Sequence, residues 1–214
     1  MGKFIKGVLG GFSGKIGTVI GSNWNGIDYM RSLPRPSSKA PTDLQVIQRA
    51  KFGFANGFLG PLGSLINMGF KTQAVKKTGF NMAITHFMAE ALIGTYPDLE
   101  IDYTKVLFSK GPLEIVWNAV ATSTVPGEIA LAWQDNTNMG TAKATDKVVI
   151  IVYNPTESKF VYKLENGPDR SAAMDMITVP DSFSGDTVQV WIATMTPDKA
   201  VFSTSAHAGQ IVVA

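Results

Sequence analysis

Residues 101–214 consist of short apolar segments separated by turn-forming residues, and no other feature of the chain constrains its fold as much. Apolar and polar side chains alternate within these segments, which is the period of a strand with one buried face. Pro, Gly, Asn and Asp lie between the segments and favour tight turns. Strands are predicted over residues 103–108, 114–121, 128–133, 147–153, 160–163, 174–179, 187–194 and 210–213. Seven or eight short strands at this spacing are typical of an antiparallel β-sandwich.

The segment between residues 42 and 94 has the periodicity of helices instead. Thr42 follows a proline as a good N-cap, and apolar residues then recur at helical spacing. The expected elements are a helix over 43–59, a short helical piece over 62–68, and a third helix that Asn81 caps and Gly94 ends.

The first thirty-six residues are rich in glycine, lysine and β-branched residues. Asn25-Gly26 accepts the positive φ angles of a type I′ turn at both central positions. Residues 16–24 and 27–33 are therefore predicted to form a β-hairpin about that turn. Pro34 ends the hairpin, and residues 35–41 are predicted to be an extended linker.

These patterns predict an α+β fold in two domains. Residues 1–100 form a basic, Gly-rich region with the hairpin and the short helices, and residues 101–214 form the β-sandwich domain. Charge is also divided along the chain. Residues 1–80 hold eleven basic and two acidic residues, a net charge of +9, whereas residues 81–214 hold eight basic and fifteen acidic residues, a net charge of −7.

The order of the sandwich segments resembles that of a known fold. Glu128-Ile-Ala-Leu-Ala-Trp133 resembles the Trp-bearing B strand of fibronectin type III domains. Residues 148–153 resemble the C strand, and residues 179–191 resemble the corner between the E and F strands. The resemblance covers about the last hundred residues and implies an Ig/fibronectin-III-like sandwich, a fold that carries many unrelated functions.

A second resemblance spans nearly all 214 residues. Residues 10–35, GGFSGKIGTVIGSNWNGIDYMRSLPR, are its most distinctive part, and shorter motifs follow at 140–146, 169–171 and 183–186. Together they resemble a family of uncharacterised proteins from Bacteroidetes-type bacteria. This resemblance implies the overall organisation of the chain and assigns no activity to it.

The segment from Gly10 to Lys15 has parts of two functional motifs and completes neither. A phosphate-binding loop requires glycine and a hydroxyl residue at the positions of Leu9 and Ile16. A nucleophile elbow requires a small residue where Lys15 stands. A structural turn is therefore the favoured interpretation, and neither nucleotide binding nor serine hydrolysis is predicted.

The inventory of reactive side chains is also poor. The chain has no cysteine, which excludes disulfides, thiolate metal sites and cysteine nucleophiles. Its two histidines are far apart in sequence; we expect His86 to be an interior or interface residue and His207 to lie in a loop. Asp169, Asp175, Asp181 and Asp186 match no EF-hand spacing, so a solvated sandwich edge is favoured over calcium. We predict no catalytic residue, metal site or cofactor.

Two binding interpretations remain open. The basic residues of the first eighty positions could neutralise phosphates while Phe12, Trp24 and Tyr29 stack on bases. Alternatively, tryptophans of the strands could stack on sugar rings, although their alternating positions favour core packing. These residues are Trp117, Trp133 and Trp191.

The chain is expected to stay in the cytoplasm, or to leave the cell by lysis as an assembled particle. It contains no run of about 18 apolar residues, so no membrane span is predicted. Glycines and Lys15 interrupt the apolar residues between Val8 and Ile20, which argues against a secretory signal.

The favoured hypothesis is a non-enzymatic structural protein that self-assembles into a homopolymeric tube, filament, shell or virion-like particle. Its partner is another copy, onto which the N-terminal hairpin docks, and no small-molecule substrate is expected. The alternatives are a glycan- or protein-binding β-sandwich module and a nucleic-acid-associated protein. The candidate subunit-contact residues are Phe4, Ile5, Val8, Leu9, Phe12, Lys15, Ile16, Val19, Ile20, Arg31 and Arg35.

Overall fold

The computed structural model describes residues 2–4, 10–24, 26–35 and 39–214. The chain divides into two compact units, Met1–Asp43 and Leu44–Ala214. The helical segment, which the sequence pattern groups with the hairpin, belongs to the second unit together with the sandwich. The reason is that its helices bury their apolar side chains in one cluster with residues of the sandwich strands.

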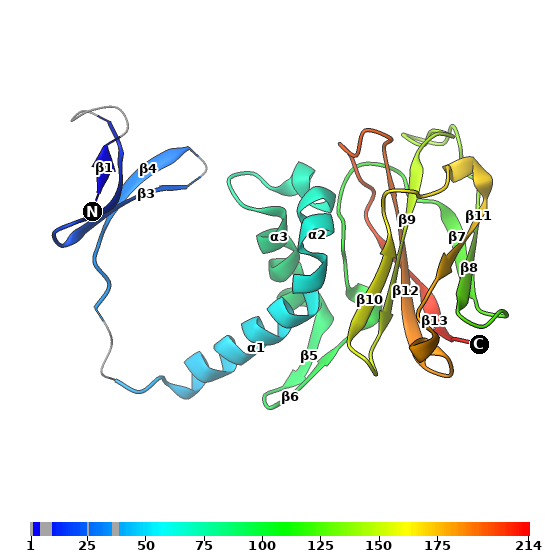
Figure 1. The fold of residues 1–214 in the computed structure, drawn as a ribbon, viewed down its shortest axis with the longest axis horizontal. Coiled ribbons are helices and arrows are strands. Elements are labelled where there is room, and N and C mark those ends of the chain that lie inside the picture. Colours follow the sequence, from blue (N-terminus) through cyan, green and yellow to red (C-terminus); the bar gives the residue numbers. More distant parts are fainter. Residues whose placement is uncertain (1, 5–9, 25, 36–38) are drawn as a thin grey trace. The chain divides into compact units, whose positions relative to one another are not determined.

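The N-terminal unit contains an antiparallel four-stranded sheet with the strand order β1-β2-β3-β4 (Figure 1). The strands are β1 (Lys3–Phe4), β2 (Phe12–Ile16), β3 (Val19–Trp24) and β4 (Ile27–Ser32). The β3–β4 pair is the predicted hairpin, and Gly26 at its turn has a φ of 83°. Asn25 lies outside the described residues. The sequence pattern missed β2, because a second turn at Gly17, with a φ of 59°, falls inside the first predicted strand.

The second unit begins with helices. They are α1 (Asp43–Leu59), η1 (Gly60–Leu62), α2 (Gly63–Gly69), η2 (Lys71–Gln73), α3 (Gly79–His86) and the π-helical turn η3 (Phe87–Ala91). The N-cap prediction for the third helix was wrong. Thr78 caps α3, since its hydroxyl accepts a hydrogen bond from the Asn81 amide at 3.2 Å. The helix also ends before Gly94, because η3 leads into a small hairpin of β5 (Leu92–Thr95) and β6 (Asp98–Ile101).

Two antiparallel sheets form the predicted sandwich, with strand orders β10-β9-β12-β13 and β11-β8-β7. The strands are β7 (Trp117–Thr122), β8 (Glu128–Gln134), β9 (Lys147–Asn154), β10 (Lys159–Lys163), β11 (Met174–Thr178), β12 (Thr187–Met195) and β13 (Ala206–Val212). The short turns η5 (Arg170–Ala172) and η6 (Asp181–Phe183) lie between them. The α+β fold with a C-terminal sandwich is thus confirmed.

One predicted strand, over residues 103–108, is wrong. Its first residues form the 3₁₀ turn η4 (Tyr103–Lys105). Asp102 explains the difference, because its carboxylate accepts hydrogen bonds from both the amide and the hydroxyl of Thr104, at 3.1 and 2.5 Å. Such a local side-chain bond favours a turn over an extended strand.

Strands β9 and β12 lie between two apolar cores. Figure 1 shows α2 and α3 on one side of β9, β10 and β12, and β7, β8 and β11 on the other. Along β9, Val149, Ile151 and Tyr153 pack in the core that contains the helices. The residues that alternate with them, Val148, Ile150 and Val152, pack in the core between the two sheets. Burial on both faces explains why β9 is an almost continuous apolar run instead of an alternating one.

Candidate interaction site on the N-terminal sheet

The strand register of the N-terminal sheet places basic and aromatic side chains on one face. Lys15 of β2 pairs with Ile20 of β3, which pairs in turn with Arg31 of β4. Residues that are paired across strands, or two apart along a strand, project to the same face. The same rule adds the pairs Ser22–Tyr29 and Trp24–Ile27. We call this set the basic–aromatic face: Lys15, Ile20, Ser22, Trp24, Ile27, Tyr29 and Arg31.

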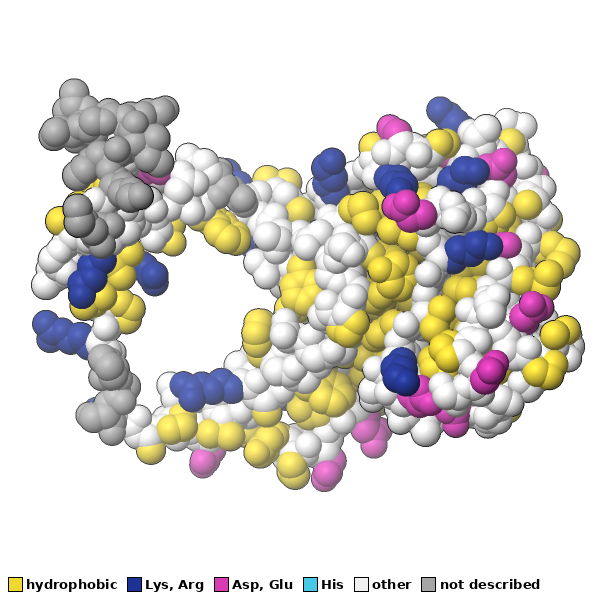
Figure 2. All heavy atoms as spheres, in the orientation of Figure 1, with side chains coloured by type: hydrophobic (Ala, Val, Ile, Leu, Met, Phe, Trp, Pro, Cys, Tyr) yellow, Lys and Arg dark blue, Asp and Glu magenta, His cyan; other side chains and the backbone are white. Residues whose placement is uncertain are grey.

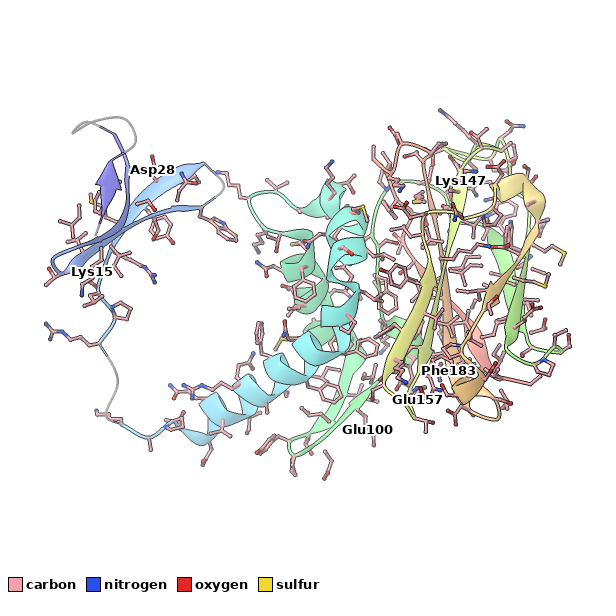
Figure 3. All side chains as sticks on the ribbon, viewed as in Figure 1. Lys15, Asp28, Glu100, Lys147, Glu157 and Phe183 are labelled. Carbon is pink, nitrogen blue, oxygen red and sulfur yellow. The ribbon has the colours of Figure 1, made fainter. Side chains whose placement is uncertain are left out.

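The opposite face carries further apolar residues and the acidic Asp28. It carries Phe12, Gly14, Ile16, Val19, Gly21, Asn23, Asp28, Met30 and Ser32. Phe12 covers Gly21 there, since a Cβ atom on Gly21 would lie 2.6 Å from Cδ2 of the Phe12 ring. Asp28 accepts a hydrogen bond from the Asn23 amide group at 2.7 Å. Lys15 and Asp28, which lie apart on the sheet in Figure 3, therefore project from different faces.

The basic–aromatic face is open to solvent and positively charged. Trp24 is 48% exposed and Tyr29 44% exposed, and Lys15 and Arg31 are also exposed. Neither cation forms an ion pair with another described residue. Figure 2 shows hydrophobic and basic side chains exposed next to one another on this unit. The face thus presents flat rings beside positive charges that no described carboxylate neutralises.

Few of the described residues of this sheet are buried. Among the described residues of β2, β3 and β4, only Gly21 is buried. Met30, on the opposite face, is 71% exposed. A few strands without a covered apolar face are marginally stable in water, so a sheet of this kind gains stability when a further surface covers it.

A groove of about 830 Å³ adjoins the end of β4. It is lined by Thr18, Val19, Met30, Arg31, Ser32, Leu33, Pro34 and Arg35. The groove therefore brings together three of the candidate contact residues, Val19, Arg31 and Arg35.

The remaining candidates are distributed over both faces. Ile5, Val8 and Leu9 lie outside the described residues, and Phe4 is in β1, where its backbone pairs with Phe12. Phe12, Ile16 and Val19 lie on the opposite face, whereas Lys15, Ile20 and Arg31 lie on the basic–aromatic face. Trp24, Ile27, Tyr29 and Met30 are not among the candidate contact residues. The alternation of side chains along β3 and β4 could have identified these four.

The aromatic residues considered for ligand stacking are also separated. Trp24 and Tyr29 share a face, but Phe12 does not. Trp133 and Trp191 are buried in different cores, and Trp117 on β7 is 41% exposed. The three strand tryptophans therefore do not form a shared platform for a sugar ring.

The two histidines have structural environments. His86, at the end of α3, is half-buried, and its pKa is lowered by burial and by the nearby Lys110 ammonium. His207 lies in β13 and not in a loop, because the last strand begins at Ala206. Its Nε2 is 2.9 Å from Oε1 of Gln189, and burial lowers its pKa.

Three of the four aspartates considered for calcium have protein partners. Asp169 and Asp175 form ion pairs with Lys147 and Lys163, each at 2.7 Å. Asp186 accepts a hydrogen bond from Asn154 at 2.8 Å. Across the described ranges, no three His, Asp or Glu side chains are grouped closely enough to hold a metal ion. No helix in these ranges is long and apolar enough to cross a membrane.

The motifs at 140–146 and 169–171 form a buried polar contact and not an open site. Arg170 and Asp146 are both fully buried, and Nη2 of Arg170 is 3.1 Å from Oδ2 of Asp146. Arg170 also donates hydrogen bonds to the Asn136 side chain and to the Glu114 carbonyl, each at 2.6 Å. In return, the Trp133 indole donates to the Arg170 carbonyl at 2.8 Å. This cluster joins the start of β9 to the segments before β7 and β11.

The chain was compared with known proteins. No curated protein matches it significantly. Among solved structures it is similar to the fibronectin type III domain of the human collagen alpha-1(XX) chain, at 10% identity over 48% of this chain and 86% of that one, with a TM-score of 0.35. It is also similar to the FN1-FN3 domains of chicken CNTN1, at 11% identity over 49% of this chain and 33% of that one, with a TM-score of 0.35. The model of DUF6266, a family of unknown function, matches residues 11–209, and the chain belongs to this family.

Proposed function

We propose that this protein is a non-enzymatic structural subunit that joins other copies of itself, with the N-terminal sheet as the connector. The observation that carries the proposal is the lack of burial in this sheet. Only Gly21 is buried among the described residues of β2, β3 and β4, although the strands carry large apolar side chains. A second surface that covers them would stabilise the sheet by about 25 cal/mol for each Å² of apolar area removed from water.

The opposite face and the free edge of β4 are the proposed contact surfaces. Ile16 and Met30 on the opposite face are 42% and 71% exposed, and Val19 is half-buried beside them. Strand β4 is the last strand of the sheet, so one of its edges has no partner strand in the described part of the chain. An unpaired edge accepts a strand from another chain through main-chain hydrogen bonds.

Charge favours a contact between unlike units. Residues 1–43 carry six basic and two acidic residues, a net charge of +4, whereas residues 44–214 carry thirteen basic and fifteen acidic residues, a net charge of −2. A basic unit of one copy is thus attracted to the acidic unit of the next. Such a head-to-tail contact produces rings when it closes, and filaments or tubes when it stays open. Shells and virion-like particles follow when contacts of this kind extend over a surface, and assembly would take place in the cytoplasm.

Negative-stain electron microscopy with light scattering tests this function on the full-length protein and on a variant that lacks residues 1–36. We expect particles or polymers from the full-length protein and monomers from the shortened one. A monodisperse full-length monomer at high concentration and moderate salt contradicts self-assembly. Equal polymerisation of both proteins contradicts the role of the N-terminal sheet and leaves self-assembly in place.

Point substitutions give a sharper version of this test. Ile16→Asp and Met30→Asp each place a charge on the opposite face and should abolish or strongly weaken assembly. Val75→Asp is the matched control, because Val75 is 77% exposed and lies in the other unit. If all three substitutions have the same effect, the opposite face is not the contact surface.

A further inference from the structure

We propose that the basic–aromatic face of the N-terminal sheet binds single-stranded nucleic acid. In this proposal Lys15 and Arg31 contact phosphates, and Trp24 and Tyr29 stack on bases. The proposal does not depend on self-assembly, because the proposed subunit contact uses the opposite face and the edge of β4. It rests on the strand register, which places the basic and the acidic side chains of β2, β3 and β4 on different faces.

The first argument is the separation of charge between the two faces. Both described cations of the paired strands β2, β3 and β4 lie on the basic–aromatic face, while Asp28 lies on the opposite one. Asp28 is also engaged by Asn23 at 2.7 Å, so it does not neutralise the cations through the sheet. Exposed cations without a carboxylate partner attract a polyanion, and the release of its counterions drives binding.

The second argument is the geometry of the rings and cations. Register places Trp24 and Tyr29 as diagonal neighbours on β3 and β4, at a Cβ separation of roughly 7 Å. Lys15 and Arg31 lie in one row with Ile20 between them, about 10 Å apart across two strand spacings. The two cations thus lie on β2 and β4, on either side of β3, while the two rings lie farther along β3 and β4 toward the turn that joins them. A chain of nucleotides that crosses the face meets positive charge and stacking surfaces in turn.

The third argument is the type of nucleic acid that these rings can engage. A base offers its flat face for stacking only when it is unpaired, whereas a duplex hides base faces inside the helix. Aromatic side chains beside a basic surface are the usual means by which proteins bind single strands without sequence preference. Trp24 and Tyr29 are about half exposed, so their rings are accessible without a rearrangement of the sheet.

Fluorescence anisotropy with labelled oligo(dT) of about 20 nucleotides tests the proposal on the full-length protein. Binding should be detected near 50 mM salt and should weaken by 200 mM salt. For two phosphate contacts, the slope of log K against log salt is expected to be about −1.4 per binding face. Quenching of tryptophan fluorescence should accompany binding, and it should be smaller in Trp24→Phe.

Substitutions on this face and in the other unit provide matched comparisons. Trp24→Ala and Tyr29→Ala should each weaken binding by about fivefold or more, because each removes one stacked base. Trp24→Phe keeps a ring and should bind more tightly than Trp24→Ala. Tyr162→Ala, on β10 of the other unit, removes a ring that is 41% exposed and should leave the affinity unchanged. Lys15→Gln combined with Arg31→Gln should remove most of the salt dependence, whereas Lys76→Gln combined with Lys77→Gln, in the other unit, should not.

Three results would overturn the proposal. The first is no binding at low salt. The second is the same affinity for Trp24→Ala, Tyr29→Ala and Tyr162→Ala, provided that circular dichroism shows the fold of each to be intact. The third is equal binding of oligo(dT), duplex DNA and heparin, because duplex and heparin supply charge without accessible base faces. That last result would assign the face to polyanions in general, or to an acidic surface of a second copy.

Discussion

Within the described residues, two antiparallel sheets of four strands differ in what covers them. In the sheet β10-β9-β12-β13, seven of the eight residues of β9 are buried, and apolar cores lie on both of its faces. In the sheet β1-β2-β3-β4, all six residues of β4 are exposed. Strand number and pairing direction are the same, so these properties do not decide the stability of either sheet. The difference lies in the apolar surfaces that each unit supplies to cover its own sheet.

The sequences of the strands reflect this difference. Strand β9 reads KVVIIVYN, an apolar run suited to burial on both faces. Strand β4 reads IDYMRS, which places an apolar and a charged residue on each face. The composition of β9 is favourable only where both faces of the strand are buried. The composition of β4 is compatible with exposure to water, and it still offers apolar area and charge to a partner.

The largest difference is expected when an aromatic residue is truncated in each unit. Phe58 at the end of α1 is buried and packs on Phe87 and Tyr153, with ring centroids 5.3 and 5.0 Å apart. Phe58→Ala should lower the free energy of unfolding by about 4 kcal/mol, since a buried ring leaves a cavity. Tyr29→Ala should change it by about 0.5 kcal/mol or less. Urea denaturation measures both, and equal losses would mean that the two units do not differ as described.

A somewhat smaller loss is expected from the buried ion pair, which has no counterpart among the described residues of the N-terminal sheet. Asp146→Ala leaves the Arg170 guanidinium buried without its carboxylate, which should cost about 3 kcal/mol. Asp169→Asn is the control, because its ion pair with Lys147 is partly exposed and is worth about 1 kcal/mol or less. Thermal denaturation of both variants tests whether burial, and not charge pairing alone, makes the contact important.

Glycine substitutions should have opposite effects on the stability of the two units. Gly21→Val places side-chain atoms against the carbonyl oxygen and the ring of Phe12 and should weaken the N-terminal sheet by about 1–3 kcal/mol. Limited proteolysis should then cut residues 1–43 faster while residues 44–214 stay protected. Gly53→Ala in α1 meets no atom within 4 Å and should instead stabilise the second unit by about 0.5–1 kcal/mol. Protection of the N-terminal unit in Gly21→Val would contradict the packing of Phe12 on this glycine.

The smallest expected effect is a dependence of stability on pH that is confined to the second unit. Burial lowers the pKa of His86 and of His207 in the folded protein, so the unfolded chain takes up protons first as the pH falls below about 6.5. Stability should therefore be complete above that pH and decline below it. Melting temperatures between about pH 7.5 and pH 5.5 measure the decline. The double variant His86→Gln, His207→Gln should flatten it, and hydrogen exchange in residues 10–35, which contain no histidine, should not follow it.

Sequence reasoning was most successful where turn residues bound a short segment that is apolar throughout or alternating, as in β9, β12 and β8. It failed where a single side chain redirects the backbone locally, as Asp102 does at η4 and Thr78 does at α3. It also placed the helices with the hairpin, because periodicity shows that a helix is amphipathic but not which surface it covers. For the site, the residue types were identified, but the two faces were not, because the turn at Gly17 fixes the register of β2 against β3.

The two-sided burial of β9 has a consequence for how the strand finds its alignment. In a half-buried strand, slippage by one residue exposes every apolar side chain, which excludes the wrong alignment. Slippage of β9 would only exchange residues such as Ile150 and Ile151 between two apolar cores. Polar groups at the two ends of the strand distinguish the alignments instead. Asp146, just before the strand, forms an ion pair with Arg170, and Asn154, at its end, donates a hydrogen bond to Asp186. Burial of the apolar residues stabilises β9, and these two polar contacts determine its register.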